Sequence, residues 1–199
     1  MPWFSRKYYR EEDTPTGYRN LESGYALLMH NPLFQQLEGT ILTKASHLNE
    51  KGSIACVFKN GTIHVNTNII LSPEQWYYVL AHNLLHLAFG HFDQDHIPPH
   101  LEFIPELWNK ACDIYITRFL YDIRLGDPFC ADPASDYPIK LNDEQKIYEY
   151  LLTHDDSAIQ TYGTNAKKQK ENIPSDTFDD FYEEELNWWD RELEEGEEL

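Results

Sequence analysis

The histidines His82 and His86 are the residues whose type and spacing most directly indicate chemistry. They lie four residues apart in the segment SPEQWYYVLAHNLLHLAFGH, residues 72–91. On an α-helix, side chains at positions i and i+4 share one face and lie about 5–6 Å apart, so two imidazoles can bind one metal ion. The pair therefore predicts a metal site, and zinc is the ion that we expect there.

The residue after the first histidine decides what such a site can do. In HExxH zinc peptidases this position holds a glutamate, which takes a proton from the attacking water. Here it holds Asn83, and an amide has no proton affinity near neutral pH. The metal-binding half of the motif is present and the general base is missing, so we expect Asn83 to be inactive in that role.

A well-marked helix must position the two histidines. Ser72, Pro73 and Gln75 suit its N-cap, its first position and its third position, as in a capping box. Gly90 marks its end. Apolar residues recur between these ends at helical spacing, namely Trp76, Val79, Leu80, Leu84 and Leu87. We predict a helix over residues 73–90 with a buried stripe beside the histidines.

A second helix is predicted over residues 105–121, after a proline-rich loop. Polar residues Asn109, Asp113 and Thr117 recur at every fourth position of this mostly apolar segment. Polar groups inside a protein need partners, and a metal ion bound by the two histidines would be a partner for Asp113. Asp113 is therefore the expected third metal ligand, and His91 is the alternative.

Residues 53–71 change to the period of two that is typical of β-strands. Asn60-Gly61 between two strand-like runs is a strong β-hairpin signal. In the second run, His64, Asn66 and Asn68 alternate with apolar residues and form a polar face. We expect a half-exposed edge strand whose polar residues bind a substrate peptide by strand addition, and a plain solvated sheet face is the alternative.

The length and the 41% hydrophobic content suit one α+β domain with appendages. We predict an N-terminal arm over residues 1–20, a domain over 21–155, a polar linker over 156–175 and an acidic amphipathic tail over 176–199. Inside the domain, two short helices broken at Asn31-Pro32 are expected before about Leu42. A closing helix is expected to follow a capping box made by Asn142 and Gln145.

The charge and cysteine content exclude several classes of protein. The chain has 34 acidic and 16 basic residues and a net charge of -18, which argues against binding to nucleic acid or an anionic membrane and favours a basic peptide or protein as partner. Without a secretion signal or a run of ~20 apolar residues, a soluble cytoplasmic protein is expected. The widely spaced Cys56, Cys112 and Cys130 are expected to be reduced thiols.

The segments WYYVLAHNLLHLAFGH and WNKACDIYIT resemble the metallopeptidase domain of bacterial proteins that often carry a von Willebrand factor A-like domain, a branch of the zincin peptidases. The resemblance includes GTIHVN, LGDP and EQKIYEYLL and covers about residues 21–152. It implies a zincin-like fold, with a small antiparallel or mixed sheet and two ligand-bearing helices. It also implies zinc ligands at His82, His86 and Asp113, and a von Willebrand factor A-like protein or an ATPase as partner.

Two functions follow from the departure of this sequence from the family at Asn83. The first is a zinc metallopeptidase domain that is catalytically impaired or uses another base, such as Glu102 or Glu106. Loss of a general base typically lowers the rate by ~10²- to 10⁴-fold. The alternative is a pseudoenzyme, a non-catalytic protein-binding module that uses the peptidase groove and the acidic tail.

Overall fold

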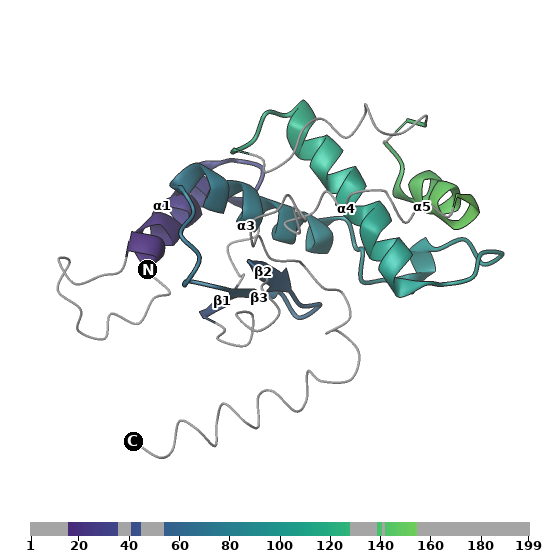
Figure 1. The fold of residues 1–199 in the computed structure, drawn as a ribbon, viewed down its shortest axis with the longest axis horizontal. Helices are drawn as coiled ribbons and strands as arrows, with labels where there is room; N and C mark the ends of the chain where they lie inside the picture. The colour runs from purple at the N-terminus through teal and green to yellow at the C-terminus, as the bar shows by residue number, and fades with distance from the viewer. Residues whose placement is uncertain (1–15, 36–40, 45–53, 128–138, 141, 155–199) are drawn as a thin grey trace, which may run out of the picture.

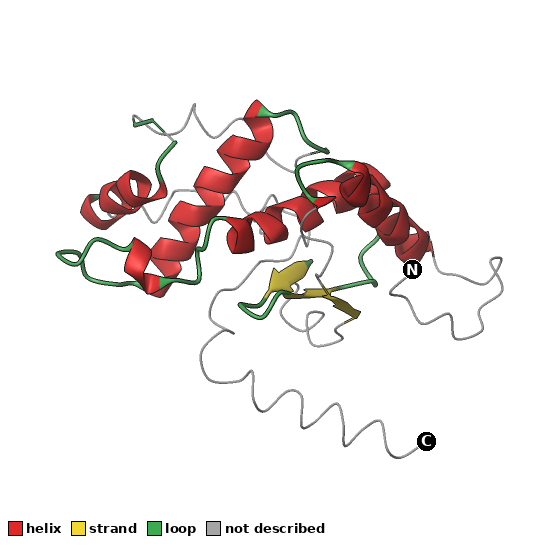
Figure 2. Ribbon diagram, turned by 180° about the vertical axis from the view of Figure 1, so that it is seen from behind, coloured by secondary structure: helices red, strands yellow, loops and turns green. Residues whose placement is uncertain are grey.

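The computed structural model describes residues 16–35, 41–44, 54–127, 139–140 and 142–154. Figures 1 and 2 show its helices lying together on one side of a small sheet, which confirms a mixed α+β class. The elements in chain order are α1 (Thr16–His30), β1 (Ile41–Lys44), β2 (Ala55–Val57), β3 (Thr62–Val65), α3 (Pro73–Ala88), the short 3₁₀ helix η3 (Gln94–His96), α4 (Pro105–Asp122) and α5 (Glu144–Thr153).

Helix α3 begins as the sequence predicts. Ser72 is the N-cap, and its hydroxyl accepts a hydrogen bond from the Gln75 backbone N–H at 3.1 Å. The Gln75 side chain accepts one from the Ser72 backbone N–H at 3.0 Å, which completes the capping box. The helix ends at Ala88, two residues before the predicted end, and Gly90 follows with a positive φ of 70°. Only glycine adopts this left-handed conformation at little cost.

Helix α1 crosses α3 at a glycine. A Cβ atom at Gly24 would lie 2.5 Å from the Cβ of Trp76 and 2.8 Å from the carbonyl oxygen of Pro73, closer than atoms can pack. The close approach lets α1 bury Leu21 and Leu28 in the main core. Because α1 holds one side of α3, it helps to fix the helix that carries both histidines.

Substitution Gly24→Ala is expected to lower the free energy of unfolding by about 1–3 kcal/mol, because the added methyl group overpacks the crossing. Urea unfolding followed by circular dichroism measures this change. Ser23→Ala is the matched control, since Ser23 is exposed on the same helix and its substitution should leave stability nearly unchanged. Equal stability of the two variants would show that the crossing relaxes at no cost.

The structure differs from the sequence predictions at the start of α1 and at Ile41–Lys44. Helix α1 begins at Thr16, so the last five residues of the predicted arm belong to the folded domain. Gly17 is buried, with the backbone oxygen of Thr67 directly beside it. The helix ends before Asn31-Pro32 as expected. Residues 36–40 of the second predicted helix lie outside the described residues, and Ile41–Lys44, where that prediction ended, forms strand β1. The β-branched residues of that segment suit a strand.

The hairpin is confirmed, but β3 is not an edge strand. Strand β2 pairs antiparallel with β3, and β1 pairs parallel with its other side, so the sheet order is β1-β3-β2. The prediction missed β1, which covers the edge that was expected to be free. His64 and Asn66 are buried, and only Asn68, in the turn after the strand, is exposed. Strand addition at β3 is therefore ruled out by its two strand neighbours.

A second apolar cluster joins α4 to α5. Helix α5 is capped by Asp143, whose side chain accepts a hydrogen bond from the Lys146 backbone N–H at 3.1 Å, so the predicted cap at Asn142 is wrong by one residue. The same helix α4 contributes Ile116 and Leu120 to the main core. The buried members of the second cluster are Ile97, Trp108, Ala111, Cys112, Ile114, Ile147, Tyr148 and Leu151.

Several sequence predictions fall outside the described residues, namely Cys130, the linker over 156–175 and the acidic tail over 176–199. Cys56 and Cys112 are buried and form no disulfide among the described residues, as expected for those two positions. No helix in the described ranges is both long and apolar enough to cross a membrane.

Candidate metal centre

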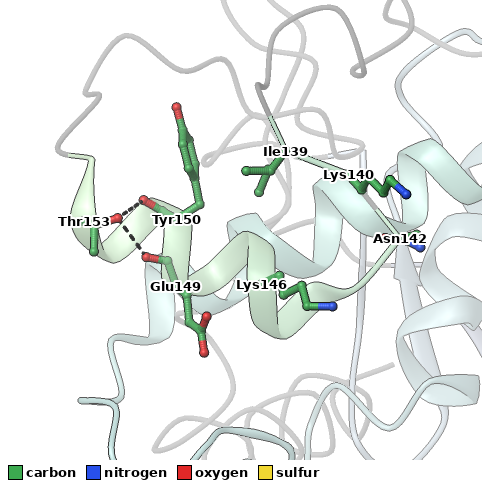
Figure 3. Close-up of a pocket in the computed structure, with 7 residues that line it drawn as sticks. All are labelled: Ile139, Lys140, Asn142, Lys146, Glu149, Tyr150 and Thr153. Carbon is green, nitrogen blue, oxygen red and sulfur yellow. Dashed lines mark hydrogen bonds between the residues drawn. The ribbon is translucent and has the colours of Figure 1, made fainter.

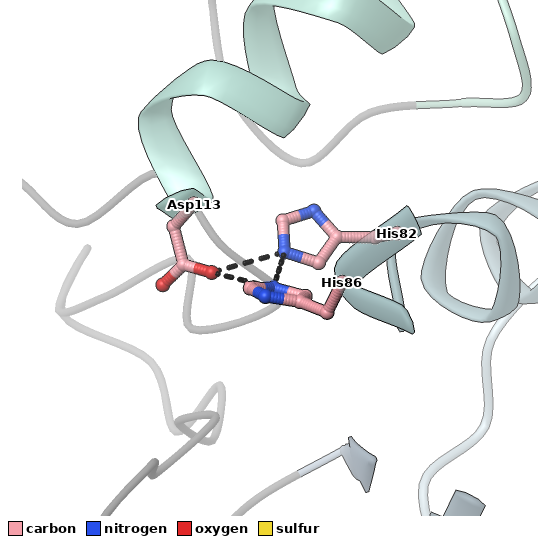
Figure 4. A group of neighbouring side chains, drawn as sticks. All are labelled: His82, His86 and Asp113. Carbon is pink, nitrogen blue, oxygen red and sulfur yellow. Dashed lines mark hydrogen bonds and ion pairs between the residues drawn. The ribbon is translucent and has the colours of Figure 1, made fainter. Parts of the chain in front are cut away.

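Helices α3 and α4 bring His82, His86 and Asp113 together. Figure 4 shows the two imidazoles, from successive turns of α3, and the carboxylate of α4 pointing toward one another. The Asp113 Oδ1 atom lies 3.1 Å from the Nε2 atom of His82 and 3.1 Å from that of His86. The two Nε2 atoms are 3.2 Å apart. These three residues form a group that could hold a metal ion.

This group is shielded from solvent. The side chains of His82 and Asp113 are 0% and 1% exposed, and that of His86 is 7% exposed. Polar groups so deeply buried require partners, and here they have mainly one another. Asp113 has one more contact, because the Asn109 side-chain amide donates to its Oδ2 atom at 3.4 Å. The polar residues predicted on one face of α4 therefore include one, Asp113, that contacts the histidine pair, and another, Asn109, that contacts Asp113.

The protonation states of His82 and Asp113 suit a metal ion. Burial lowers the pKa of His82, and the nearby Asp113 carboxylate offsets this only in part. For Asp113, burial opposes ionisation, but the hydrogen bonds from His82 and His86 outweigh it and lower its pKa to about 2. A neutral imidazole and an ionised carboxylate are the forms that bind a divalent metal.

Without a cation, the two Nε2 atoms lie unfavourably close. Asp113 Oδ1 could accept from both rings, but the two N–H dipoles would then lie side by side with their nitrogens 3.2 Å apart. If either nitrogen lacks its hydrogen, its lone pair faces the carboxylate. A bound cation removes this conflict, because it interacts favourably with both lone pairs and with the carboxylate.

Asn83, at the position of the general base, is turned toward its own helix. Its side-chain amide donates a hydrogen bond to the Val79 carbonyl oxygen at 2.8 Å, and the residue is 1% exposed. At about 100° per residue, position 83 lies about 60° around α3 from His86, on the flank of the histidine face. A carboxylate could not make this bond, because it has no hydrogen to donate.

His91 lies on the far side of the His86 ring from the group of three. Its Nδ1 atom is 3.3 Å from the Nδ1 atom of His86, and the two rings are nearly perpendicular, at 81°. It is therefore not among the residues that the structure groups as metal donors. Burial lowers the pKa of His91 to about 2, and the neighbouring His86 adds to this effect, so the ring is neutral.

The other residues singled out in the sequence lie elsewhere. The ring of His64, within β3, packs edge-on against Phe58 at 4.5 Å between ring centres. Asn66 accepts a hydrogen bond from the backbone N–H of Asn68, which forms a turn after the strand. Glu102 and Glu106, named as replacement bases, are exposed.

The matched family agrees with this geometry. Residues 34–179 match the model of the family described as "Putative metallopeptidase domain". The chain belongs to this family. The match to the metallopeptidase domain includes α3 and α4 entirely and thus all three residues of the candidate centre. Neither the curated proteins nor the solved structures contain a match to this chain.

A hollow on α5 is separate from the centre. Figure 3 shows it near the end of the described chain, where the Thr153 hydroxyl donates to backbone oxygens of its own helix. None of its lining residues belongs to the candidate centre, and they are Ile139, Lys140, Asn142, Lys146, Glu149, Tyr150 and Thr153. The hollow therefore shares no lining residue with the candidate centre.

Two contacts were not predicted from the sequence, that between His86 and His91 and that of Trp108 with His91. The signal was present, because Gly90 in a left-handed C′ position places residues C″ and C3 in contact, and these are His91 and His86. The Trp108 indole N–H donates to the His91 carbonyl oxygen at 2.9 Å, a tertiary contact that no local pattern could reveal.

Proposed function

We propose that this chain is a zincin-like, zinc-binding metallopeptidase domain whose peptidase activity is impaired because Asn83 stands in place of the general base. The observation that carries the proposal is the spacing of 3.1–3.2 Å among His82 Nε2, His86 Nε2 and Asp113 Oδ1. In a tetrahedral zinc site with Zn–N distances of ~2.0–2.1 Å, neighbouring ligand atoms lie ~3.3–3.4 Å apart. The three residues present therefore fit zinc closely.

The donor set favours a catalytic type of zinc site over a structural type. Structural sites are usually closed by four protein ligands, whereas catalytic sites use three, often two histidines and a carboxylate. His82, His86 and Asp113 would supply such a set. When bound there, zinc would act as a Lewis acid on a peptide carbonyl and lower the pKa of water.

The impairment rests on what Asn83 does in the structure. Its amide is buried and donates to Val79, so it offers no group that can accept a proton from water. A missing general base typically lowers the rate by ~10²- to 10⁴-fold. The domain would then keep its metal and hydrolyse peptides only slowly.

The same observation favours one alternative, a non-catalytic module that binds a peptide or protein. In that case the domain of residues 21–155, extended to Thr16, keeps the peptidase groove, and the acidic tail over 176–199 selects a basic partner by charge. A von Willebrand factor A-like protein or an ATPase is the partner proposed from the family resemblance.

Protein purified without chelator is expected to contain close to one equivalent of zinc by elemental analysis. Removal of zinc should also lower the melting temperature, because a ligand at 1,000 times its Kd stabilises by ~4 kcal/mol, or about 8–16 °C for a domain of this size. The control is His86→Ala, which removes one donor and should lose both the zinc and the chelator effect. A zinc-free wild type, or unchanged zinc content in His86→Ala, would contradict the proposal.

A further inference from the structure

His91 is a buried polar residue that is not one of the three candidate metal donors. It is 1% exposed, and its Nδ1 atom lies 3.3 Å from the Nδ1 atom of His86. That nitrogen of His86 is the one that does not face Asp113, since the Nε2 atom makes that contact. His91 thus contacts the outer side of a candidate metal ligand.

The end of helix α3 holds His91 in this position. The backbone N–H of Gly90 donates to the Leu87 carbonyl at 3.1 Å, and that of His91 donates to the His86 carbonyl at 3.0 Å. This pair of bonds is the Schellman motif, with Gly90 in the left-handed conformation that it requires. The motif usually brings two apolar side chains together, but here it brings two imidazoles together.

Helix α4 fixes His91 from the other side. The Trp108 indole N–H donates to the His91 carbonyl oxygen at 2.9 Å, and Trp108 is itself 1% exposed. Helix α4 also carries Asp113. The same two helices therefore position the three candidate donors and the residue behind one of them.

The chemistry of imidazole decides which of the two rings donates the hydrogen in this contact. If the Nε2 atom of His86 binds a metal, its Nδ1 atom must carry the ring hydrogen and needs an acceptor. The His91 Nδ1 atom contacts it at 3.3 Å and can accept if the hydrogen of His91 lies on Nε2. Among the described residues, that Nε2 atom has no hydrogen-bond partner in either tautomer, so the contact with His86 decides between them.

We propose that His91 is a positioning residue, which accepts a hydrogen bond from His86 Nδ1 and so fixes the tautomer and ring orientation of His86 as a metal ligand. This inference rests on the proposed zinc site and assigns His91 to its outer shell, not to the metal itself. Residues in that shell matter for affinity, because they hold the ligand ring in the geometry that the metal requires.

The test compares His91→Leu with His91→Asn. Leucine and asparagine have similar shapes, but only the asparagine Oδ1 atom offers an acceptor close to where His91 has Nδ1. Zinc affinity is measured by competition with a chromophoric chelator. We expect a loss of about 10- to 100-fold for His91→Leu, as is typical of outer-shell residues, and a clearly smaller loss for His91→Asn.

Two measurements on the zinc-loaded wild type separate this role from that of a ligand or a purely structural residue. X-ray absorption should count two imidazoles on zinc, and a count of three would overturn the inference by making His91 a ligand. Nitrogen-15 spectra of the histidine rings should place the hydrogen of His86 on Nδ1 and that of His91 on Nε2. A hydrogen on His91 Nδ1 would overturn the inference. Because this measurement uses the wild type, it does not depend on the folding of a variant.

The outcomes also separate this inference from the proposed function. Zinc bound equally well by the wild type and His91→Leu would overturn the role of His91 alone. A wild type that binds no zinc would overturn the proposed function and this role together.

Discussion

Substitution Asn83→Glu is expected to raise peptide hydrolysis by about 10²- to 10⁴-fold, because it returns a proton acceptor to the flank of the histidine face. A glutamate cannot donate to the Val79 carbonyl oxygen as Asn83 does, so its carboxylate is repelled from that position. In a site this deeply buried, desolvation also raises the pKa of a carboxyl group toward the range that suits a general base.

Cleavage of a broad peptide library by zinc-loaded protein, followed by mass spectrometry, measures this gain. Asn83→Gln is the matched control, since glutamine has the length of glutamate without its proton affinity and should give no gain. The double variant Asn83→Glu with His86→Ala should be inactive if the activity depends on the metal. An Asn83→Glu protein that binds zinc but cleaves no peptide would favour the non-catalytic binding module.

The elements that carry the centre could be predicted from sequence because their signals are local. The capping box of Ser72 and Gln75 places the start of α3, and the spacing of His82 and His86 within that helix puts both rings on one face. The polar line on α4 pointed to Asp113, since a carboxylate on a buried helix needs a partner. The structure brings these three side chains together, and their role as zinc ligands remains a prediction.

The sheet could not be predicted equally well, because strand order depends on contacts between distant segments. The alternation around His64 is the same for an edge strand and for a central strand. The pairing of Leu42 with Ile63 decides between them, and β1 has only four residues to signal it. Likewise, the position of His91 depends on how α3 ends and on Trp108 from α4, neither of which periodicity reports.

Substitution Asp113→Asn is expected to weaken zinc binding by about 10²- to 10³-fold while the metal-free domain stays folded. Structural zinc sites with four ligands supply ~10–16 kcal/mol, so one ligand accounts for roughly 2.5–4 kcal/mol. Asparagine keeps the shape of Asp113 but not its charge, which is fully buried beside the two Nε2 atoms. In the metal-free protein, the asparagine Oδ1 atom can still accept from the rings that contact Asp113 Oδ1.

Chelator competition measures the affinity of Asp113→Asn, and thermal unfolding without metal measures its fold. The matched control is Asp122→Asn, the same change on the same helix at a carboxylate that is 54% exposed and paired with Arg118, which should leave zinc affinity unchanged. Wild-type affinity in Asp113→Asn would remove the carboxylate from the ligand set. His91 would then be the next candidate for the third donor among the described residues, and its binding to zinc would contradict its assignment as the acceptor behind His86. Weak zinc binding by Asp113→Asn, with still two imidazoles on zinc, would instead support both assignments, Asp113 as a ligand and His91 as the acceptor behind His86. The loss would then come from the carboxylate on α4 and not from a change in the histidine ligands.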